Sequence, residues 1–576
     1  MKSKLSSFTA ILLAVLLCLS QATVAATALS GSGTQENPYL IASVADLREL
    51  ANKVNSGDSM KDKTVLLTAN IVLSGDWTPI GTKDNPFNGS FDGNGFKISG
   101  LSVKGNDVVG LFGFSKGVIK NVKVEGSVSG GSSVGGIAGY SEGKISGCIF
   151  NGTVEGSSGV AGITGESRAD IQNCVNRAGI KGKENVGGIV GQLKKAHSIT
   201  DCVNYGTVTA SEKQRHYGGI VGLFGDELNW SAENSIIKDC TNNGSISGGG
   251  YLTAGIAGYV CFKGLVTNCV NTGEVSAPEG TLVAGITGAL YMQAELRDCT
   301  NTGKITGGDG SGFIDDLKFI DAKYLTGVAG IVGLSYCSED LYNCVNKGEI
   351  NGSRTAAGIV AISHYGGSCY SCSNFGNISV SFDGGDDYKY GAAGGIEGWS
   401  NVNAGKCFNS GSIYNPGETP TGGILGFCWG GADAVSNNLN TGKVTGKNNV
   451  GGIVGKSYQN IIDHCQNKGN LEAIGQEGSM FGGIVGQGQA CTVKQCKNSG
   501  KIVTESTAFI YVGGISGKVT NSQIEWCINE ANVGKSIDYD QFHGGIVGYA
   551  HSSAISNCKN TGLIMCSFFL QAFAVF

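Results

Sequence analysis

Acidic and aromatic side chains gather in two segments that interrupt an otherwise regular, glycine-rich sequence. These segments are 309–324 and 382–390, and the nine residues that we predict to bind a ligand are Asp315, Asp316, Asp321, Tyr324, Asp383, Asp386, Asp387, Tyr388 and Tyr390. Aromatic rings stack on the apolar faces of sugars, and carboxylates accept hydrogen bonds from hydroxyls or, when grouped, hold calcium. The residue types therefore favour carbohydrate binding, with calcium as a weaker alternative and no other cofactor. The plain alternative is that both segments are solvated loops.

Motifs for catalysis are missing from the sequence. None of the six histidines belongs to an HExxH zinc motif, and neither a G-x-S-x-G elbow nor a P-loop occurs. Glu397 is the one acidic residue that directly follows a Gly-Gly-Ile sequence, and it has no partner carboxylate at the same place in a neighbouring repeat, whereas a glycosidase needs two. We therefore expect that the protein is not an enzyme, and a polysaccharide-active enzyme is the least favoured alternative.

The cysteines indicate a structural role. Thirteen of the 20 cysteines recur once per repeat, at positions 148, 174, 202, 240, 269, 299, 344, 372, 407, 465, 496, 527 and 558. Equivalent cysteines on stacked coils would have parallel Cβ directions, which are poorly aimed for disulfides. Cysteine is also a small apolar residue that is often buried. Cys369 and Cys372 form a C-x-x-C pair, but no second pair or suitably spaced histidine accompanies them, so we expect no metal site.

The element that positions all these residues is a repeat centred on Gly-Gly-Ile-Val-Gly. The central isoleucines are 137, 163, 189, 220, 256, 286, 331, 359, 396, 424, 453, 484, 515 and 546. Such a period indicates a repeat architecture. Each unit has room for three short strands but for no helix, which predicts an all-β fold, a parallel β-helix of about fifteen coils with three strands per coil. The two acidic segments precede Ile331 and Ile396, so they occupy the same corner two coils apart, about 10 Å along the axis.

A second column holds asparagine two residues after each column cysteine, from Asn176 to Asn560. In the first unit Phe150 takes this place. Asparagine tolerates the left-handed turn conformation, and amides stacked on successive coils can hydrogen-bond to one another. The column therefore predicts a turn at one corner of the coil and an amide ladder along it.

The rest of the chain divides around this array. Residues 1–28 have the positive start, the apolar run and the small residues of a signal peptide. We expect residues 29–105 to form a cap with a helix from Ser43 to Asn55, residues 106–562 the solenoid, and residues 563–576 an apolar tail. The net charge of −5 comes with no basic cluster, which argues against nucleic acid as a partner. No stretch is long enough to span a membrane.

The sequence Val109-Gly110-Leu111-Phe112-Gly113 and the Gly-Gly-Ile-Val-Gly series resemble GLUG repeats, which occur in secreted and surface proteins of bacteria and in non-catalytic regions of IgA-specific metallopeptidases. The resemblance covers about 106–562 and carries no catalytic residues. It implies a secreted or cell-surface, adhesin-like solenoid that binds extracellular glycans or surface proteins. The alternative is a purely structural stalk or a fragment of a larger surface protein, with end-to-end contacts as a further kind of partner.

Overall fold

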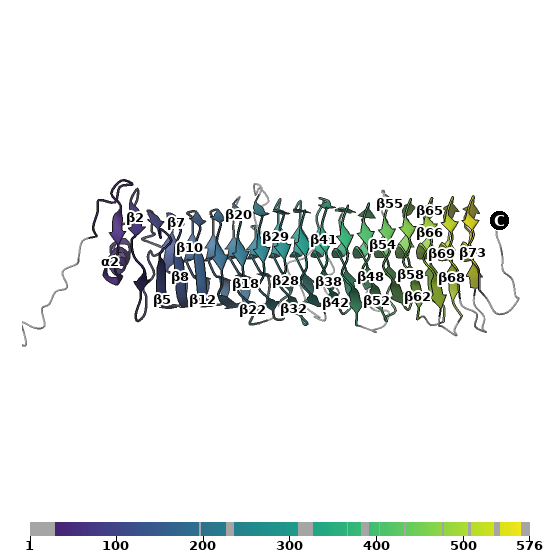
Figure 1. Cartoon of the computed structure of the whole chain (residues 1–576), viewed down its shortest axis with the longest axis horizontal. Helices are drawn as coiled ribbons and strands as arrows, with labels where there is room; N and C mark the ends of the chain where they lie inside the picture. The colour runs from purple at the N-terminus through teal and green to yellow at the C-terminus, as the bar shows by residue number, and fades with distance from the viewer. Residues whose placement is uncertain are drawn as a thin grey trace, which may run out of the picture.

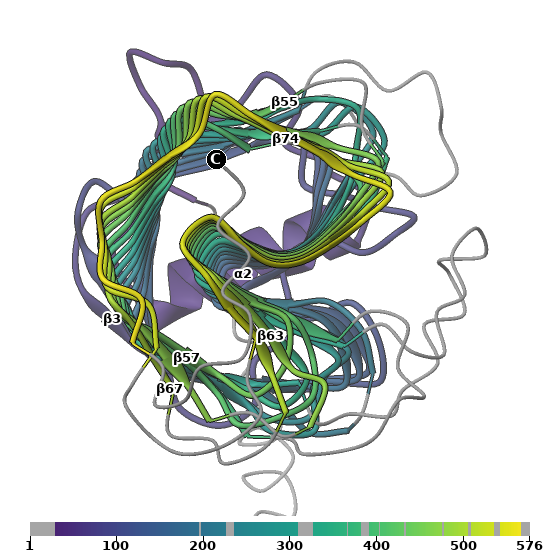
Figure 2. The same ribbon diagram turned by 90° about the vertical axis from the view of Figure 1, so that its right-hand side faces the viewer.

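The chain forms a long rod of stacked β-coils, shown from the side in Figure 1 and along its axis in Figure 2. The computed structural model describes residues 29–565 except 195–196, 213, 226–234, 309–325, 366, 382–390, 403, 431–433, 475–476, 505–508 and 535–541. Every strand pairing between successive coils is parallel, as in β10–β14 (Ala138–Ser141 with Thr164–Ser167). The predicted parallel β-solenoid is therefore confirmed.

One regular coil holds five short strands in four sheets. It begins with β60 (Ile461–Asp463) in sheet A and continues with β61 (Gln466–Asn467) and β62 (Leu471–Ala473) in sheet B. It ends with β63 (Met480–Gly482) in sheet D and β64 (Val485–Gln489) in sheet C. The expected three strands per coil are therefore wrong. Two of the expected strands each divide at a sharp corner, one at His464–Cys465 and the other at Gly483–Ile484.

The Gly-Gly-Ile corner between sheets D and C bends into the interior of the coil, where Figure 2 shows it near the centre of the cross-section. A side chain at Gly483 would clash with the carbonyl oxygen of Gly514 and with the side chain of Asn498. A Cβ at Gly486 would lie 2.5 Å from the carbonyl oxygen of Gly455. Glycine is required at both positions because the backbones of adjacent coils and sheets approach so closely. The side chain of Ile484, the residue directly after Gly483, is fully buried.

The predicted asparagine ladder is confirmed. The Nδ2 atom of Asn301 donates to Oδ1 of Asn346 at 2.8 Å and to the carbonyl oxygen of Gly303 at 2.9 Å. Equivalent amide-to-amide bonds of 2.8–2.9 Å link the ladder residues, which are Asn176, Asn204, Asn242, Asn271, Asn301, Asn346, Asn374, Asn409, Asn440, Asn467, Asn498, Asn529 and Asn560. All but the last are fully buried.

The predicted left-handed conformation of these asparagines is wrong, because they lie in the short strands of sheet B. Positive φ angles fall instead on the residue before each column cysteine, such as Asn268 (53°), Asp298 (56°) and Asn343 (54°). This is the corner where the chain passes from sheet A to sheet B. Polar residues with short side chains tolerate that conformation, so the turn signal was present in the sequence but three residues earlier.

The column cysteines fill the core, as expected. Cys299 is fully buried, and its thiol donates to the carbonyl oxygen of Arg297 at 3.3 Å. The cysteines of the described residues are free thiols and all are buried except Cys558, which is half-buried. Burial raises the pKa of thiols such as Cys148 and Cys202 above the usual value, so these side chains remain neutral and act as small apolar groups.

A second buried cluster lies against sheets C and D in the middle of the rod. It includes Leu223, Tyr259, Tyr291, Tyr336 and Trp399. The rings of Tyr291 and Tyr336 stack at 5.4 Å. In the coils on either side of this stretch, the same register position of sheet C is polar. Gln192 takes the place next to Leu223, and Lys456 takes the place next to Phe427. The same coils carry the three longest insertions in the repeat.

The N-terminal segment contains the expected helix, α2 (Val44–Asn55), which lies at the purple end of the rod in Figure 1. The Ser43 hydroxyl caps it by accepting from the backbone N–H of Asp46 at 3.3 Å. Leu47, Leu50 and Val54 are fully buried. The same segment contains the strands β2 (Thr64–Leu67), β3 (Ile71–Val72) and β5 (Lys97–Lys104).

The predicted signal peptide and residues 566–576 of the predicted tail lie outside the described residues, and the domain boundaries stay predictions. No helix in the described part of the chain has both the length and the apolar character needed to cross a membrane.

We predict that Asn301→Ala weakens the rod. The change leaves the Asn271 donor and the Asn346 acceptor without their buried partners, and each unsatisfied group costs about 1–3 kcal/mol. The denaturant midpoint should fall clearly below that of the wild type. Lys347→Ala, an exposed change next to the ladder, is the control. Equal midpoints for the two variants would show that the ladder does not stabilise the coils.

Candidate functional site

All nine predicted binding residues lie outside the described part of the chain, in the ranges 309–325 and 382–390. Their placement, and the carbohydrate and calcium binding predicted for them, stay predictions. The structure instead offers a site that the sequence did not single out, on the outer face of sheet A.

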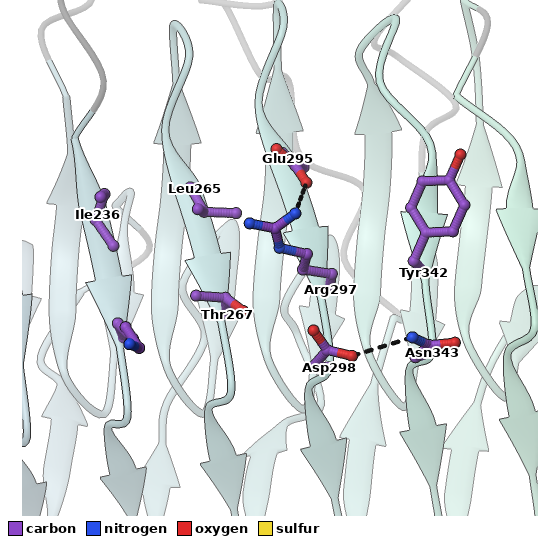
Figure 3. A pocket seen from close by; sticks show the side chains of 9 residues that line it. Ile236, Leu265, Thr267, Glu295, Arg297, Asp298, Tyr342 and Asn343 are labelled. Atoms are coloured by element: carbon purple, nitrogen blue, oxygen red, sulfur yellow. Dashed lines mark hydrogen bonds and ion pairs between the residues drawn. The ribbon is translucent and has the colours of Figure 1, made fainter.

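This site is an open pocket of about 610 Å³ formed by four successive coils (Figure 3). The strands that form it are β25 (Ile236–Lys238), β30 (Leu265–Thr267), β35 (Glu295–Arg297) and β40 (Leu341–Tyr342). The lining residues are Ile236, Lys238, Leu265, Thr267, Glu295, Arg297, Asp298, Tyr342 and Asn343. Each coil therefore contributes one or more neighbouring outward side chains to a surface that runs along the rod.

Strand alternation decides which side chains reach this surface. The middle residue of each strand points into the core, so that Ile237, Val266 and Leu296 are fully buried. The residues on either side of it point outward. Parallel register then aligns Lys238 with Thr267 and Arg297 with Tyr342 on adjacent strands.

The charged groups of the pocket are paired with one another. The Nη1 atom of Arg297 lies 3.0 Å from Oε1 of Glu295, and Nδ2 of Asn343 donates to Oδ1 of Asp298 at 3.1 Å. At the other end, Nζ of Lys238 lies 3.6 Å from a carboxylate oxygen of Asp239, which is outside the lining set. The lining thus holds two cations and two carboxylates, and both donors and acceptors face solvent.

Tyr342 gives the pocket an exposed aromatic surface. Its side chain is 42% exposed, and its ring stacks on that of Tyr370 in the next coil, with centroids 5.8 Å apart and planes 18° apart. The Tyr342 hydroxyl donates to Oδ2 of Asp340 at 3.0 Å. That hydrogen bond raises the pKa of Tyr342 above its usual value. In Figure 3 the broad face of the ring is turned toward the viewer.

The sequence contained a signal for this site. Lys238, Thr267, Arg297 and Tyr342 each precede a column cysteine by two residues, and Asp298 and Asn343 each precede one by a single residue. These positions form columns, like those of cysteine and asparagine, that bring charged and aromatic residues together on one face. They lie within regular repeats and not where the period is broken, so an irregular repeat length does not mark them.

Glu397, the sequence's candidate for catalysis, lies inside the core. It begins β49 (Glu397–Ser400), is fully buried, and pairs in register with Val360 and Leu425 of the adjacent coils. Neither carboxylate oxygen has a hydrogen-bond partner at normal distance. Burial raises the pKa of Glu397 to about 7. A polysaccharide outside the rod cannot contact this carboxyl group, so it is not placed for glycosidic chemistry.

The described residues contain no group of three or more His, Cys, Asp or Glu side chains placed to hold a metal ion. The C-x-x-C pair is part of the core, where Cys369 and Cys372 are both fully buried. His464 is exposed at a corner, with its Nδ1 atom 2.7 Å from Oδ1 of Asp463.

Comparison with known proteins gives partial matches. No family model matches the chain. It is 36% identical over 102 residues to a protein of Evansella cellulosilytica whose name describes it as a Gly-rich membrane protein, and 36% identical over 109 residues to halomucin of Haloquadratum walsbyi. Each match covers 17% of this chain but only 12% and 1% of those proteins. The chain is thus similar to small parts of much longer proteins.

Among solved structures, the chain is similar to a crystal structure from Bacteroides ovatus whose title refers to an immunoglobulin A1 protease. The identity is 20%, the TM-score is 0.31, and the match covers 64% of this chain and 86% of that one. At this TM-score the similarity carries no argument about function, and the GLUG resemblance stays a prediction.

We predict that Glu397 makes the stability of the rod depend on pH. Because its pKa in the folded chain is about 7 and is near 4.3 when unperturbed, the folded state keeps a proton that the unfolded state loses. Stability should therefore fall as the pH rises from about 4.5 to about 7, by about 3 kcal/mol, and then level off.

The measurement is the denaturant midpoint at pH 5 and pH 8 for the wild type, for Glu397→Gln and for the control Glu477→Gln, which changes an exposed residue. The wild type and the control should lose stability between the two pH values, and the loss should be smaller for Glu397→Gln. An equal loss in all three proteins would contradict the role of Glu397.

Proposed function

We propose that the chain is a secreted or cell-surface, adhesin-like solenoid that binds extracellular glycans or surface proteins and catalyses no reaction. The observation that carries this proposal is the outer face of sheet A. It holds Arg297, Tyr342 and Asn343 in a regular parallel register over a buried core. Such a preorganised surface loses little conformational entropy when a ligand binds.

The architecture supports the same function. Sheet C alone has 15 strands, which at about 4.8 Å per coil makes a rod on the order of 70 Å long. A rod of this kind places binding surfaces at a distance from whatever holds one end. The names of the two matched proteins, a Gly-rich membrane protein and halomucin, support a location at a cell surface. The GLUG resemblance supports it as well.

A purely structural stalk is the second candidate. The stalk is favoured by the pairing of the charged groups in the pocket, because charges on a surface that binds no ligand also pair in this way. The pairs are Arg297 with Glu295 and Asn343 with Asp298. The segments 309–324 and 382–390 belong to the binding proposal, through the nine acidic and aromatic residues that the sequence places there.

We predict that the intact chain binds glycans on an array, with a control chain of scrambled coil order or a heat-denatured sample showing no signal. If the segment 382–390 carries the binding, glycan binding should be abolished when four of its residues are replaced together by alanine, namely Asp386, Asp387, Tyr388 and Tyr390. Binding that survives these changes would exclude the 382–390 loop as the site. A chain that binds no glycan and no cell surface would favour the stalk.

A further inference from the structure

We propose that the sheet A pocket is a binding site for a neutral oligosaccharide that lies along the rod, with one sugar ring against Tyr342. The inference rests on the proposed function, since it assumes an extracellular ligand, and it names the site and the chemical class of that ligand.

The dimensions of the pocket suit a short linear chain. It extends over the four strands from β25 to β40, and three steps of about 4.8 Å correspond to about 14 Å along the axis. The backbone register repeats from coil to coil, so successive units of a linear ligand meet equivalent positions of the rod, although each coil presents a different side chain there. The volume of about 610 Å³ is that of an ordinary small-molecule site.

The charge pattern selects a neutral ligand. A ligand anion would compete with Glu295 for Arg297 and with Asp239 for Lys238. A ligand cation would compete with Arg297 for Glu295. Breaking such a charge-assisted pair costs more than breaking a hydrogen bond between neutral groups. A sugar hydroxyl avoids this competition because it both donates and accepts. It can donate to a free lone pair of Glu295 or Asp298 and accept from a remaining N–H of Arg297 or Asn343.

The aromatic part of the pocket is held in place before a ligand arrives. The stack on Tyr370 and the hydrogen bond to Asp340 fix the ring of Tyr342 at both its body and its tip. The next coil has Gly405 at the register of Tyr370, and a Cβ there would lie 2.6 Å from the Tyr370 ring. Glycine therefore lets the Tyr370 ring lie against the backbone, so that the pair of tyrosines forms an aromatic surface at one end of the pocket.

The opposite end of the pocket holds two apolar side chains beside Lys238. Ile236 and Leu265 are adjacent in register and half-buried on the outer face. Sugar rings have apolar C–H faces as well as hydroxyl edges, so the apolar or aromatic side chains at each end, with polar groups beside and between them, match one oligosaccharide. A phosphate or an isolated metal ion uses neither the tyrosine nor the apolar end.

The experiment is titration calorimetry with the full chain and two sets of oligosaccharides of equal length. One set holds neutral sugars, such as gluco-, xylo-, manno- and galacto-oligosaccharides, and the other holds uronate-containing sugars. We expect binding of at least one neutral oligosaccharide and weaker binding of its acidic counterpart. Tyr342→Ala should lower the affinity by about tenfold, since it removes the stacking surface, and Arg297→Gln should lower it as well. Tyr342→Phe keeps the ring and should stay within about threefold of the wild type.

The matched control is Tyr414→Ala, which removes a tyrosine of similar exposure (49%) from sheet B, outside the pocket. Thermal unfolding of each variant checks that the coils remain folded. Neutral-sugar binding that persists unchanged in both Tyr342→Ala and Arg297→Gln would overturn the assigned site and leave the proposed function intact. A preference for the acidic sugars would overturn the assigned ligand class. Failure of the wild type to bind any sugar would overturn both this inference and glycan binding as the proposed function.

Discussion

The contact between the Gly-Gly-Ile corner and the asparagine ladder determines the cross-section of the rod. The corner enters the coil from one side, and the ladder amides of sheet B meet it there, as Asn498 meets Gly483. No side chain fits between them. The Asn498 amide is already satisfied, because its Nδ2 donates to Oδ1 of Asn529 and its Oδ1 accepts from the backbone N–H of Gly500. A polar ladder can lie in the interior because all of its hydrogen-bonding groups are paired. The interior is therefore divided by a backbone-to-amide contact and is not filled with apolar side chains alone.

The parallel stacking that this contact requires also explains the outer surface. Because every coil repeats the same corner, the strands of sheet A keep one register over many coils, and outward residues separated by about thirty positions in the sequence become neighbours. The pocket is a direct result: Lys238, Thr267, Arg297 and Tyr342 are adjacent only because β25, β30, β35 and β40 are aligned. The core residues behind them, such as Val266 and Leu296, keep that surface rigid.

Glu397 shows how much variation the core accepts. Its position in register is occupied by Val360 on one side and Leu425 on the other, so a carboxyl group replaces an aliphatic one in an otherwise regular column. The surrounding groups include the thiols of Cys369 and Cys428, and the carboxyl group itself is far from solvent. A buried acid without a strong partner is stable mainly in its protonated form. An acidic residue at an aliphatic position of the repeat thus affects the stability of the folded rod and does not by itself indicate a catalytic site.

The sequence by itself determined the repeat, the burial of the isoleucine and cysteine columns, the asparagine ladder and the capped helix at Ser43, because each depends on residue types that recur locally or at a constant period. It did not determine how many strands a coil contains. The left-handed corner at His464 is occupied by residues of many types in other coils, and the requirement for glycine at 483 comes from contacts with the neighbouring coil that only stacking creates.

The pocket on sheet A was decided only by the tertiary structure. Its residues come from four coils and lie far apart in the sequence, although their spacing from the column cysteines gives their common register. Stacking restores that register physically, through parallel backbone hydrogen bonds, and brings Arg297 beside Tyr342. The chemistry of each side chain was present in the sequence, and their proximity is a property of the folded rod.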